Sequence, residues 1–348
     1  MISLQFSLDY ELFGDGSGSV YREQINPTSE LLDIFDEYGA KLTIYFEIGQ
    51  YLAFEKLKHS DPDFFEANKA IEEQLKDAVR RGHDVQLHLH PTWLNANYEN
   101  GTWQLDIDAF DITSLELDQI VKILSFGKKF LEELLKPVRD SYECIAFRAG
   151  AWSANDNKKY IQALEKSGFF IDSTVVKGAF LNSNYGKFDF RSYDKRTHWK
   201  CKDSLNFNDE HGKITQVPIM SLIGRKYNLI YLNKKRKQVN QIVRRVYKTK
   251  VTEQGKTKFD KLVSMISRNY IMADFNFIRG NVLFYMLRKY CSCHLNDKEV
   301  IPVVFIGHSK TSYFNGDIVS FFKKVEKEND KQYVYHTISE FYKCKEGL

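Results

Sequence analysis

The segment Gly82-His-Asp-Val-Gln-Leu-His-Leu-His-Pro91 is the most informative part of this chain. Apolar and polar residues alternate over residues 84–90, which predicts a β-strand whose successive side chains point to opposite faces. Residues 63–81 before it and 114–135 after it have the apolar spacing of amphipathic helices. The order helix, strand, helix therefore predicts one unit of an alternating series.

The same alternation continues in both directions along the chain. It predicts further strands over residues 2–8, 41–46, 144–147, 169–172, 270–275 and 300–306, and further helices over residues 28–38, 155–167 and 280–291. Strands separated by helices usually pair in parallel, so we expect an α/β domain, either a barrel or a doubly wound sheet. In both architectures the loops after the strands carry the function.

Length and composition favour one enlarged domain. The 348 residues are 43% hydrophobic, which is enough for one large core, so we expect a single domain over 1–348. Residues 176–219 mix aromatic with polar residues, as hairpins and loops do, and residues 225–250 are strongly basic and read as helix. We therefore expect an elaborated insertion at about 176–265.

Several classes of protein are disfavoured by the composition. The net charge of +4 and the charged fraction of 28% are ordinary, so no nucleic-acid partner is expected. The sequence has no apolar run long enough to span a membrane, no leader pattern and five irregularly spaced cysteines, so we expect a cytoplasmic protein with reduced thiols. The basic residues 225–250 fit either peripheral contact with the inner membrane surface or a solvated helix face.

Two pairs of side chains at predicted strand ends have the composition of a metal site. His88 and His90 are two residues apart, so both imidazoles lie on one face of a strand. Asp9 and Glu11 have the same spacing at the end of the first strand. Imidazoles with a carboxylate are common ligands of divalent metals, and a second carboxylate suits base catalysis. Without the acids, the histidines are equally well explained as polar residues of a half-exposed strand.

Two later segments add candidates. Arg148 and Trp152 lie in Ala146-Phe-Arg-Ala-Gly-Ala-Trp152, where the arginine could brace a carboxylate and the tryptophan could stack on a sugar ring. A surface ion pair and a core aromatic are the alternatives. His308 ends the apolar segment Val303-Val-Phe-Ile-Gly-His308, and an imidazole with a pKa of about 6.5 suits general-acid catalysis. Alone, it is equally a polar cap.

Four motifs therefore follow one another at strand ends: Asp9-Tyr-Glu11, His88-Leu-His-Pro91, Arg148-Ala-Gly-Ala-Trp152 and Gly307-His308. In this order they resemble the polysaccharide deacetylase family of NodB type, over residues 1 to about 310. The resemblance implies a distorted (β/α)7-type barrel that binds one divalent metal ion and hydrolyses acetyl groups on glycans. We therefore expect a hydrolase acting on an N-acetylated sugar.

The resemblance also implies roles for individual residues. Asp9 would be the base, Arg148 its brace and His308 the general acid, while the metal would be bound by Glu11, His88 and His90. Trp152 and Tyr10 would contact the substrate. The ligands suit zinc, and cobalt, nickel or iron are accepted by the same set.

The motifs depart from the usual family pattern at three places. The first motif has Asp9-Tyr-Glu11 instead of two aspartates, the histidines are separated by one residue instead of a longer gap, and Gly150 and Ala151 replace the usual proline. The sequence of the motif at residues 82–91 resembles a divergent branch of the family associated with bacterial surface-polysaccharide biosynthesis. This implies an acetylated sugar, nucleotide-linked or lipid-linked, as the substrate.

Several alternatives stay open at this point. A non-catalytic protein that binds a glycan or a lipid carrier could have the same fold, and so could a hydrolase of a non-sugar amide. His83 would replace a ligand if His88 and His90 could not reach one metal. Asp172 and Asp274, each near a predicted strand end, are reserve candidates.

Overall fold

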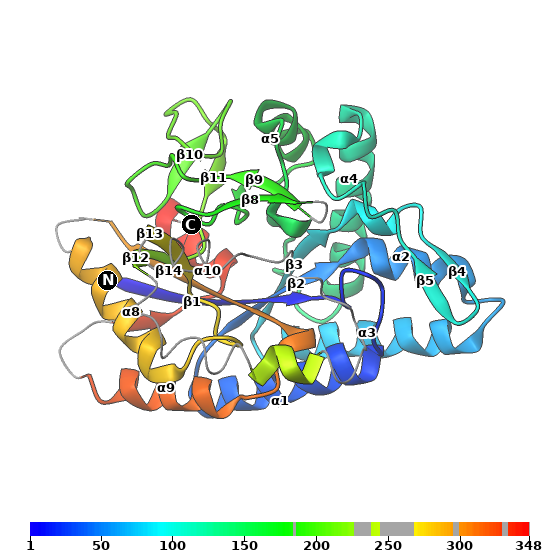
Figure 1. Cartoon of the computed structure of the whole chain (residues 1–348), viewed down its shortest axis with the longest axis horizontal. Helices are drawn as coiled ribbons and strands as arrows, with labels where there is room; N and C mark the ends of the chain where they lie inside the picture. Colours follow the sequence, from blue (N-terminus) through cyan, green and yellow to red (C-terminus); the bar gives the residue numbers. More distant parts are fainter. Residues whose placement is uncertain (184–185, 226–237, 244–267, 295–298, 329–332, 348) are drawn as a thin grey trace, which may run out of the picture.

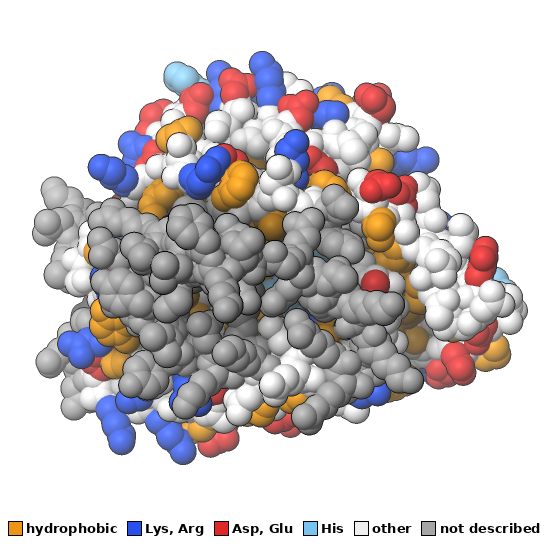
Figure 2. Space-filling view, in the orientation of Figure 1, with side chains coloured by type: hydrophobic (Ala, Val, Ile, Leu, Met, Phe, Trp, Pro, Cys, Tyr) orange, Lys and Arg blue, Asp and Glu red, His pale blue; other side chains and the backbone are white. Residues whose placement is uncertain are grey.

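A computed structural model describes residues 1–183, 186–225, 238–243, 268–294, 299–328 and 333–347. Most of the basic span 225–250 lies outside these residues; within it, residues 238–243 are helical. Figure 2 shows basic and acidic side chains interspersed along the upper part of the described surface. This mixture agrees with the ordinary overall charge of the sequence.

A nine-stranded sheet forms the centre of the molecule (Figure 1). Its order is β10-β11-β7-β6-β3-β2-β1-β14, and β15 pairs with the start of β1. The strands are β1 (Ile2–Tyr10), β2 (Leu42–Glu47), β3 (Asp84–Leu89), β6 (Ala146–Ala149), β7 (Ile171–Asp172), β10 (Trp199–Cys201), β11 (Ile214–Gln216), β14 (Ile301–His308) and β15 (Tyr333–Tyr335). All neighbours pair in parallel except β10 with β11.

The segment after β11 closes this sheet into a barrel. Ile219 forms parallel bridges to Val176 on one side and to Val304 of β14 on the other. The Ile219 amide donates to the Val175 carbonyl at 2.9 Å, and the Met220 amide donates to the Val304 carbonyl at 2.8 Å. The wall therefore runs through β1, β2, β3, β6, β7, residues 217–220 and β14. The prediction of a (β/α)7-type barrel is confirmed, and the doubly wound alternative is wrong.

Helices pack around the barrel, and Figure 1 shows α1, α3 and α9 along its lower side with α4 and α5 above. They are α1 (Asn26–Glu37), α2 (Ile48–Leu57), α3 (Pro62–Arg80), α4 (Leu117–Leu135), α5 (Asn157–Lys166), α8 (Gly280–Cys293), α9 (Gly316–Glu326) and α10 (Ile338–Glu346). Short helical turns are η1 (Val20–Ile25), η2 (Pro91–Trp93), η3 (Ile112–Ser114), η4 (Gly150–Trp152) and η6 (Ser309–Thr311). None of the described helices is both long enough and apolar enough to span a membrane.

The local sequence explains why α3 has these limits and this orientation. It begins after Asp61, whose carboxylate accepts a hydrogen bond from the Asp63 amide at 3.0 Å, and Pro62 supplies a helical φ at the first position. It ends before Gly82, which has a φ of 83° that glycine adopts without strain. Its buried apolar residues follow the helical period and face the barrel: Phe64, Ala67, Ile71, Leu75, Ala78 and Val79.

The predicted strands and helices are present within a few residues of their predicted bounds. The helices expected to close the domain after residue 306 are α9 and α10. The structure adds α2, β15 and the hairpin of β4 (Asn97–Glu99) and β5 (Thr102–Gln104). The expected insertion contains the hairpin of β8 (Phe180–Ser183) and β9 (Gly186–Asp189), and β12 (Ser221–Arg225) pairs with β13 (Arg268–Met272). Residues 214–220 of the same span belong to the barrel wall.

Candidate active site

The polar side chains predicted to form a site lie at the carboxyl ends of the barrel strands. The strand register places Asp9 beside His308, and it places His88 between Glu47 and Arg148. Since parallel strands end at the same side of a barrel, residues far apart in the sequence meet there. The surrounding apolar core therefore holds them in a fixed arrangement.

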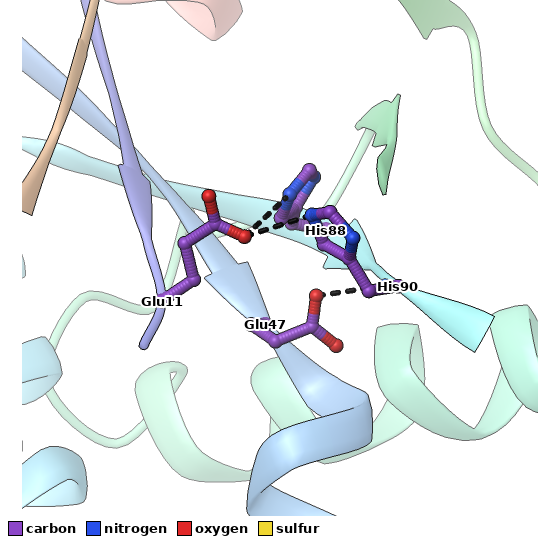
Figure 3. Close-up of side chains that lie close together, drawn as sticks. All are labelled: Glu11, Glu47, His88 and His90. Carbon is purple, nitrogen blue, oxygen red and sulfur yellow. Dashed lines mark hydrogen bonds and ion pairs between the residues drawn. The ribbon is translucent and has the colours of Figure 1, made fainter. Parts of the chain in front are cut away.

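Figure 3 shows four side chains close together at the carboxyl ends of β1, β2 and β3. Glu11, Glu47, His88 and His90 each offer one ligand atom, and these atoms all lie within 4.8 Å of one another. The Oε2 atom of Glu11 is 2.8 Å from Nε2 of His90 and 3.5 Å from Nε2 of His88. One carboxylate oxygen and two imidazole nitrogens therefore converge, as the sequence predicted for metal ligands.

The protonation of His88 fits a metal ligand. Its Nδ1 atom lies 2.8 Å from the carbonyl oxygen of Arg148, and a carbonyl only accepts, so Nδ1 carries the proton. The Nε2 atom then has a lone pair. This atom is buried and has no hydrogen-bond partner among the described residues. A ligating histidine usually has this arrangement, with its second nitrogen fixed by a backbone carbonyl.

Glu47 is a member of the group that the sequence analysis missed. Its Oε2 accepts a hydrogen bond from the His90 amide at 2.7 Å, and its Oε1 accepts one from the Gly49 amide at 2.8 Å. Burial raises the pKa of Glu47 to about 8. The side chain therefore holds the backbone of His90 in place. An acid directly after the apolar residues 42–46 was the available signal in the sequence.

Gly150 allows the third motif to approach the second. A Cβ atom on this residue would lie 2.5 Å from Cγ of His90 and 2.6 Å from the Leu89 carbonyl oxygen. No other residue type leaves this space. The next two residues, Ala151 and Trp152, have φ values of 49° and 51°, in the left-handed region that side chains rarely adopt. Backbone strain at this turn therefore accompanies the close packing against His90.

Lys310 pairs with the other oxygen of Glu11. Its Nζ atom lies 2.7 Å from Oε1 of Glu11 and donates to the Leu12 carbonyl at 3.1 Å. Burial would raise the pKa of the Glu11 carboxyl, but the charges of Lys310 and His90 outweigh burial and hold this pKa well below its usual value. Glu11 is therefore ionised before any metal binds.

Asp9 forms an ion pair with Arg148 inside the barrel. Nη1 of Arg148 lies 2.5 Å from Oδ1 of Asp9, and Nη2 donates to the Ser7 hydroxyl at 2.9 Å. The guanidinium is fully buried and lies over the Tyr45 ring, 4.0 Å from its centroid. Burial is the largest single effect and would raise the pKa of Asp9, but the charges of Arg148, His88 and His308 together lower it. Arg148 therefore keeps Asp9 ionised and oriented.

His308 lies on the side of Asp9 away from Arg148. Its Nε2 atom is 3.7 Å from Oδ2 of Asp9, and its Nδ1 atom is 3.8 Å from Oδ2 of Asp274. The Trp152 ring meets the imidazole edge to face, with centroids 6.4 Å apart. His308 and Trp152 are both partly exposed, so a substrate at the carboxyl end can reach them.

Tyr10 does not lie with the other predicted residues. It points to the opposite face of β1 from Asp9 because side chains alternate along a strand, and it is fully buried. A substrate cannot reach its ring, so we do not include Tyr10 in the site.

His83 and Asp172 are also occupied elsewhere. His83 precedes β3 at the amino end of the barrel, and its Nδ1 accepts a hydrogen bond from the Leu42 amide at 3.1 Å. Asp172 accepts hydrogen bonds from the Tyr160 hydroxyl at 2.5 Å and the Thr174 hydroxyl at 2.7 Å. Neither is a replacement ligand. Asp274, the other reserve candidate, lies beside His308, with its Oδ2 atom 3.8 Å from Nδ1 of the imidazole.

Comparison with known proteins shows the fold to which this arrangement belongs. No family model and no curated protein matches the sequence. The crystal structure of a protein from Mycobacterium smegmatis, assigned to the polysaccharide deacetylases, aligns over 99% of this chain and 90% of that chain, with a TM-score of 0.53 and 14% sequence identity. The chain has the polysaccharide deacetylase fold. The resemblance predicted from the four motifs is thus confirmed for the fold.

Two further structures align over the full length of this polysaccharide deacetylase fold. They are Puue allantoinase and a protein from Pseudomonas aeruginosa PAO1 assigned to the polysaccharide deacetylases. Each alignment covers 100% of this chain and 92% of the other, with 11% identity and a TM-score of 0.49. At this level of similarity they add nothing to the assignment.

Proposed function

We propose that the protein is a metal-dependent hydrolase that removes an N-acetyl group from a sugar. The observation that carries the proposal is the convergence of two groups at the carboxyl end of the barrel. Glu11, His88 and His90 present one oxygen and two nitrogens to a common point, and the braced carboxylate of Asp9 lies beside them with His308. The fold, which the chain shares with a structure assigned to the polysaccharide deacetylases, supports the same reaction class.

Glu11, His88 and His90 would hold the metal, and the unpartnered Nε2 of His88 supports this assignment. Two imidazoles and a carboxylate suit zinc, and the same ligands accept cobalt, nickel or iron. When bound, the metal supplies Lewis-acid activation of a water molecule and of the acetyl carbonyl. All other steps fall to side chains of this chain.

Asp9 is the general base in this proposal. Its carboxylate removes a proton from the attacking water, and Arg148 keeps it ionised for that task. As the carbon–nitrogen bond breaks, His308 donates a proton to the departing sugar nitrogen. The balance is one water consumed, with acetate and an amino sugar released. Trp152, beside His308, is positioned to stack on the sugar ring.

We further propose a cytoplasmic role in the assembly of a surface polysaccharide. The substrate would then be an acetylated sugar carried by a nucleotide or by a lipid at the inner membrane face. The basic residues 225–250 would serve the carrier or the membrane surface, as their composition predicts. These steps rest on the resemblance of the motifs.

The test combines metal analysis with acetate release. The purified chain is expected to contain one divalent metal per molecule and to release acetate from N-acetylated sugars offered free, nucleotide-linked or polymeric. Asp9→Asn, which can still accept a hydrogen bond from Arg148, should retain the metal and lose acetate release. Absence of a stoichiometric metal together with full activity of Asp9→Asn would overturn the proposal. Sugar binding without acetate release would indicate a non-catalytic glycan-binding protein instead.

A further inference from the structure

Lys310 approaches the proposed metal ligands from η6, the turn that follows β14. β14 ends at His308, and the turn η6 directs the chain back across the end of β1. The Ser309 hydroxyl fastens this turn, since it accepts from the Glu11 amide at 3.3 Å and donates to the Glu11 carbonyl at 3.4 Å. The next side chain, Lys310, then lies against Glu11 with only 15% of its surface exposed.

The two oxygens of Glu11 are divided between two kinds of partner. Oε1 pairs with the Lys310 ammonium at 2.7 Å, whereas Oε2 faces His90 at 2.8 Å and His88 at 3.5 Å. A metal among the histidines would therefore meet a carboxylate that has one oxygen available. Two-oxygen ligation would bring the metal toward the Lys310 ammonium, and the repulsion between these like charges opposes it.

In a second group of potential metal ligands, the negative charge of each acid is also offset by a buried cation. Asp9, Glu11 and His308 also have ligand atoms within 4.8 Å of one another. However, Arg148 pairs with Asp9 and Lys310 pairs with Glu11, so a buried cation offsets each acid. A dication at this second position would meet two balanced ion pairs and one imidazole. The geometry thus favours a single metal, at Glu11, His88 and His90.

We propose that Lys310 is a positioning residue that restricts Glu11 to one-oxygen ligation and lowers the affinity of the site for its metal. Because Lys310 already balances Glu11, the carboxylate among the three proposed ligands, that carboxylate would offset less of the charge of a bound dication. The metal would also exchange more readily than in a site with an uncompensated carboxylate. This inference rests on the metal site of the proposed function.

Two opposing effects of removing Lys310 must be weighed. Loss of the hydrogen bond to Oε1 would loosen Glu11, and loss of a partner of a ligand usually weakens metal binding. Loss of the positive charge would strengthen binding, because like charges a few ångströms apart repel strongly in a buried site. Glu11 remains held through its backbone, which exchanges two hydrogen bonds with the Ser309 hydroxyl. The charge effect should therefore dominate.

The experiment measures zinc affinity by competition with a chelator in the full chain. Lys310→Met removes both charge and donor, whereas Lys310→Gln removes the charge and keeps a donor for Oε1. Lys128→Met is the matched control, since Lys128 pairs with Glu132 at 2.9 Å far from the site. Both Lys310 variants should bind zinc at least about tenfold more tightly than wild type. The control should bind zinc as wild type does.

Thermal unfolding gives a second readout that a merely structural lysine would not produce. Lys310→Met leaves the buried Glu11 carboxylate without its cation, so the metal-free variant should melt below wild type. Zinc should then raise its midpoint by more than it raises the wild-type midpoint. If metal-free Lys310→Met does not fold, Lys310→Gln carries the comparison.

The outcomes separate the two proposals. If wild type binds zinc and both Lys310 variants bind it equally or more weakly, the role of Lys310 is refuted and the metal site stands. If neither wild type nor any variant binds zinc, the proposed function fails and this inference fails with it.

Discussion

Both ends of β3 carry polar and titratable residues, but the partners of these residues differ between the two ends. At the amino end, Asp84 accepts hydrogen bonds from the Ser339 hydroxyl at 2.6 Å and the Gln86 amide group at 3.1 Å, and His83 accepts one from the Leu42 amide. At the carboxyl end, Nε2 of His88 has no hydrogen-bond partner among the described residues and faces Glu11. Both ends are buried.

The difference shows that residue type alone does not define a site. At the amino end, each polar group lies beside a partner of opposite character, including Nε2 of His83 at 3.0 Å from Oδ1 of Asp36. These pairs connect β3 to β2, α1 and α10. At the carboxyl end, acids and imidazoles from separate strands face a common point. This division agrees with the rule that barrel enzymes use their carboxyl ends for chemistry and their amino ends for stability.

The largest expected effect separates the two histidines of this strand. His88→Asn should abolish stoichiometric metal binding and reduce acetate release to the level without enzyme, because one of two imidazole ligands is lost. His83→Asn should retain the metal and the activity. Metal analysis and an acetate assay check both variants. Retention of the metal by His88→Asn would contradict the ligand assignment.

The next effect concerns the proposed general acid at the carboxyl end. His308→Asn should lower kcat by roughly 10²- to 10⁴-fold, the usual contribution of a positioned proton donor. Its metal content and unfolding midpoint should stay close to wild type, since the imidazole is partly exposed and is not a proposed ligand. A fall in kcat of less than about tenfold would assign proton donation to another group.

A smaller effect, on stability alone, is expected at the amino end. Asp84→Ala should lower the free energy of unfolding by about 2 to 4 kcal/mol, because buried donors of Gln86 and Ser339 lose their acceptor. Urea unfolding measures the loss, and Asp84→Asn, which retains an acceptor, should lose less. KM and kcat should not change. A change in kcat without a loss of stability would contradict the assignment of the amino end of β3 to stability alone.

The smallest effect is a dependence of stability on pH through His83. Burial lowers the pKa of this imidazole to about 4, whereas the unfolded chain binds the proton below about 6.5. Between these values the unfolded state binds more protons, so stability should fall as the pH falls, by about 1.4 kcal/mol per pH unit. His83→Gln should lack this contribution. Equal pH dependence of wild type and variant in urea unfolding would refute it.

The sequence predicted most of the barrel because its strands and helices have regular periods. It did not predict α2, whose buried residues lie on all sides, including Ile48, Gly49, Tyr51 and Phe54, so no apolar face stands out. The periodicity alone also could not decide between a barrel and an open sheet, and the barrel was expected from the resemblance of the motifs. That choice depends on Ile219 lying between two segments that are distant in the sequence.

The sequence analysis also named most of the residues that meet at the carboxyl end, because each follows an apolar strand. Glu47 and Lys310 were not among them: Glu47 ends a strand as the others do but stands outside the four motifs, and a lysine in a turn has no distinctive pattern. Their importance comes from strand register, which brings Glu47 beside His88 and the end of β14 beside the end of β1. Tyr10 was named in error because the alternation along β1 was not applied to it.

The burial of Arg148 has a consequence for how the chain folds. Its guanidinium is satisfied by Ser7 and Asp9 of β1, by the Tyr45 ring of β2, and by the Ser173 carbonyl at 3.0 Å. These partners span residues 7 to 173, which is the first half of the 348-residue chain. A half-barrel that ends before residue 173 would carry an incompletely paired cation in its interior. We therefore expect amino-terminal fragments that include Arg148 but end before residue 173 not to fold independently.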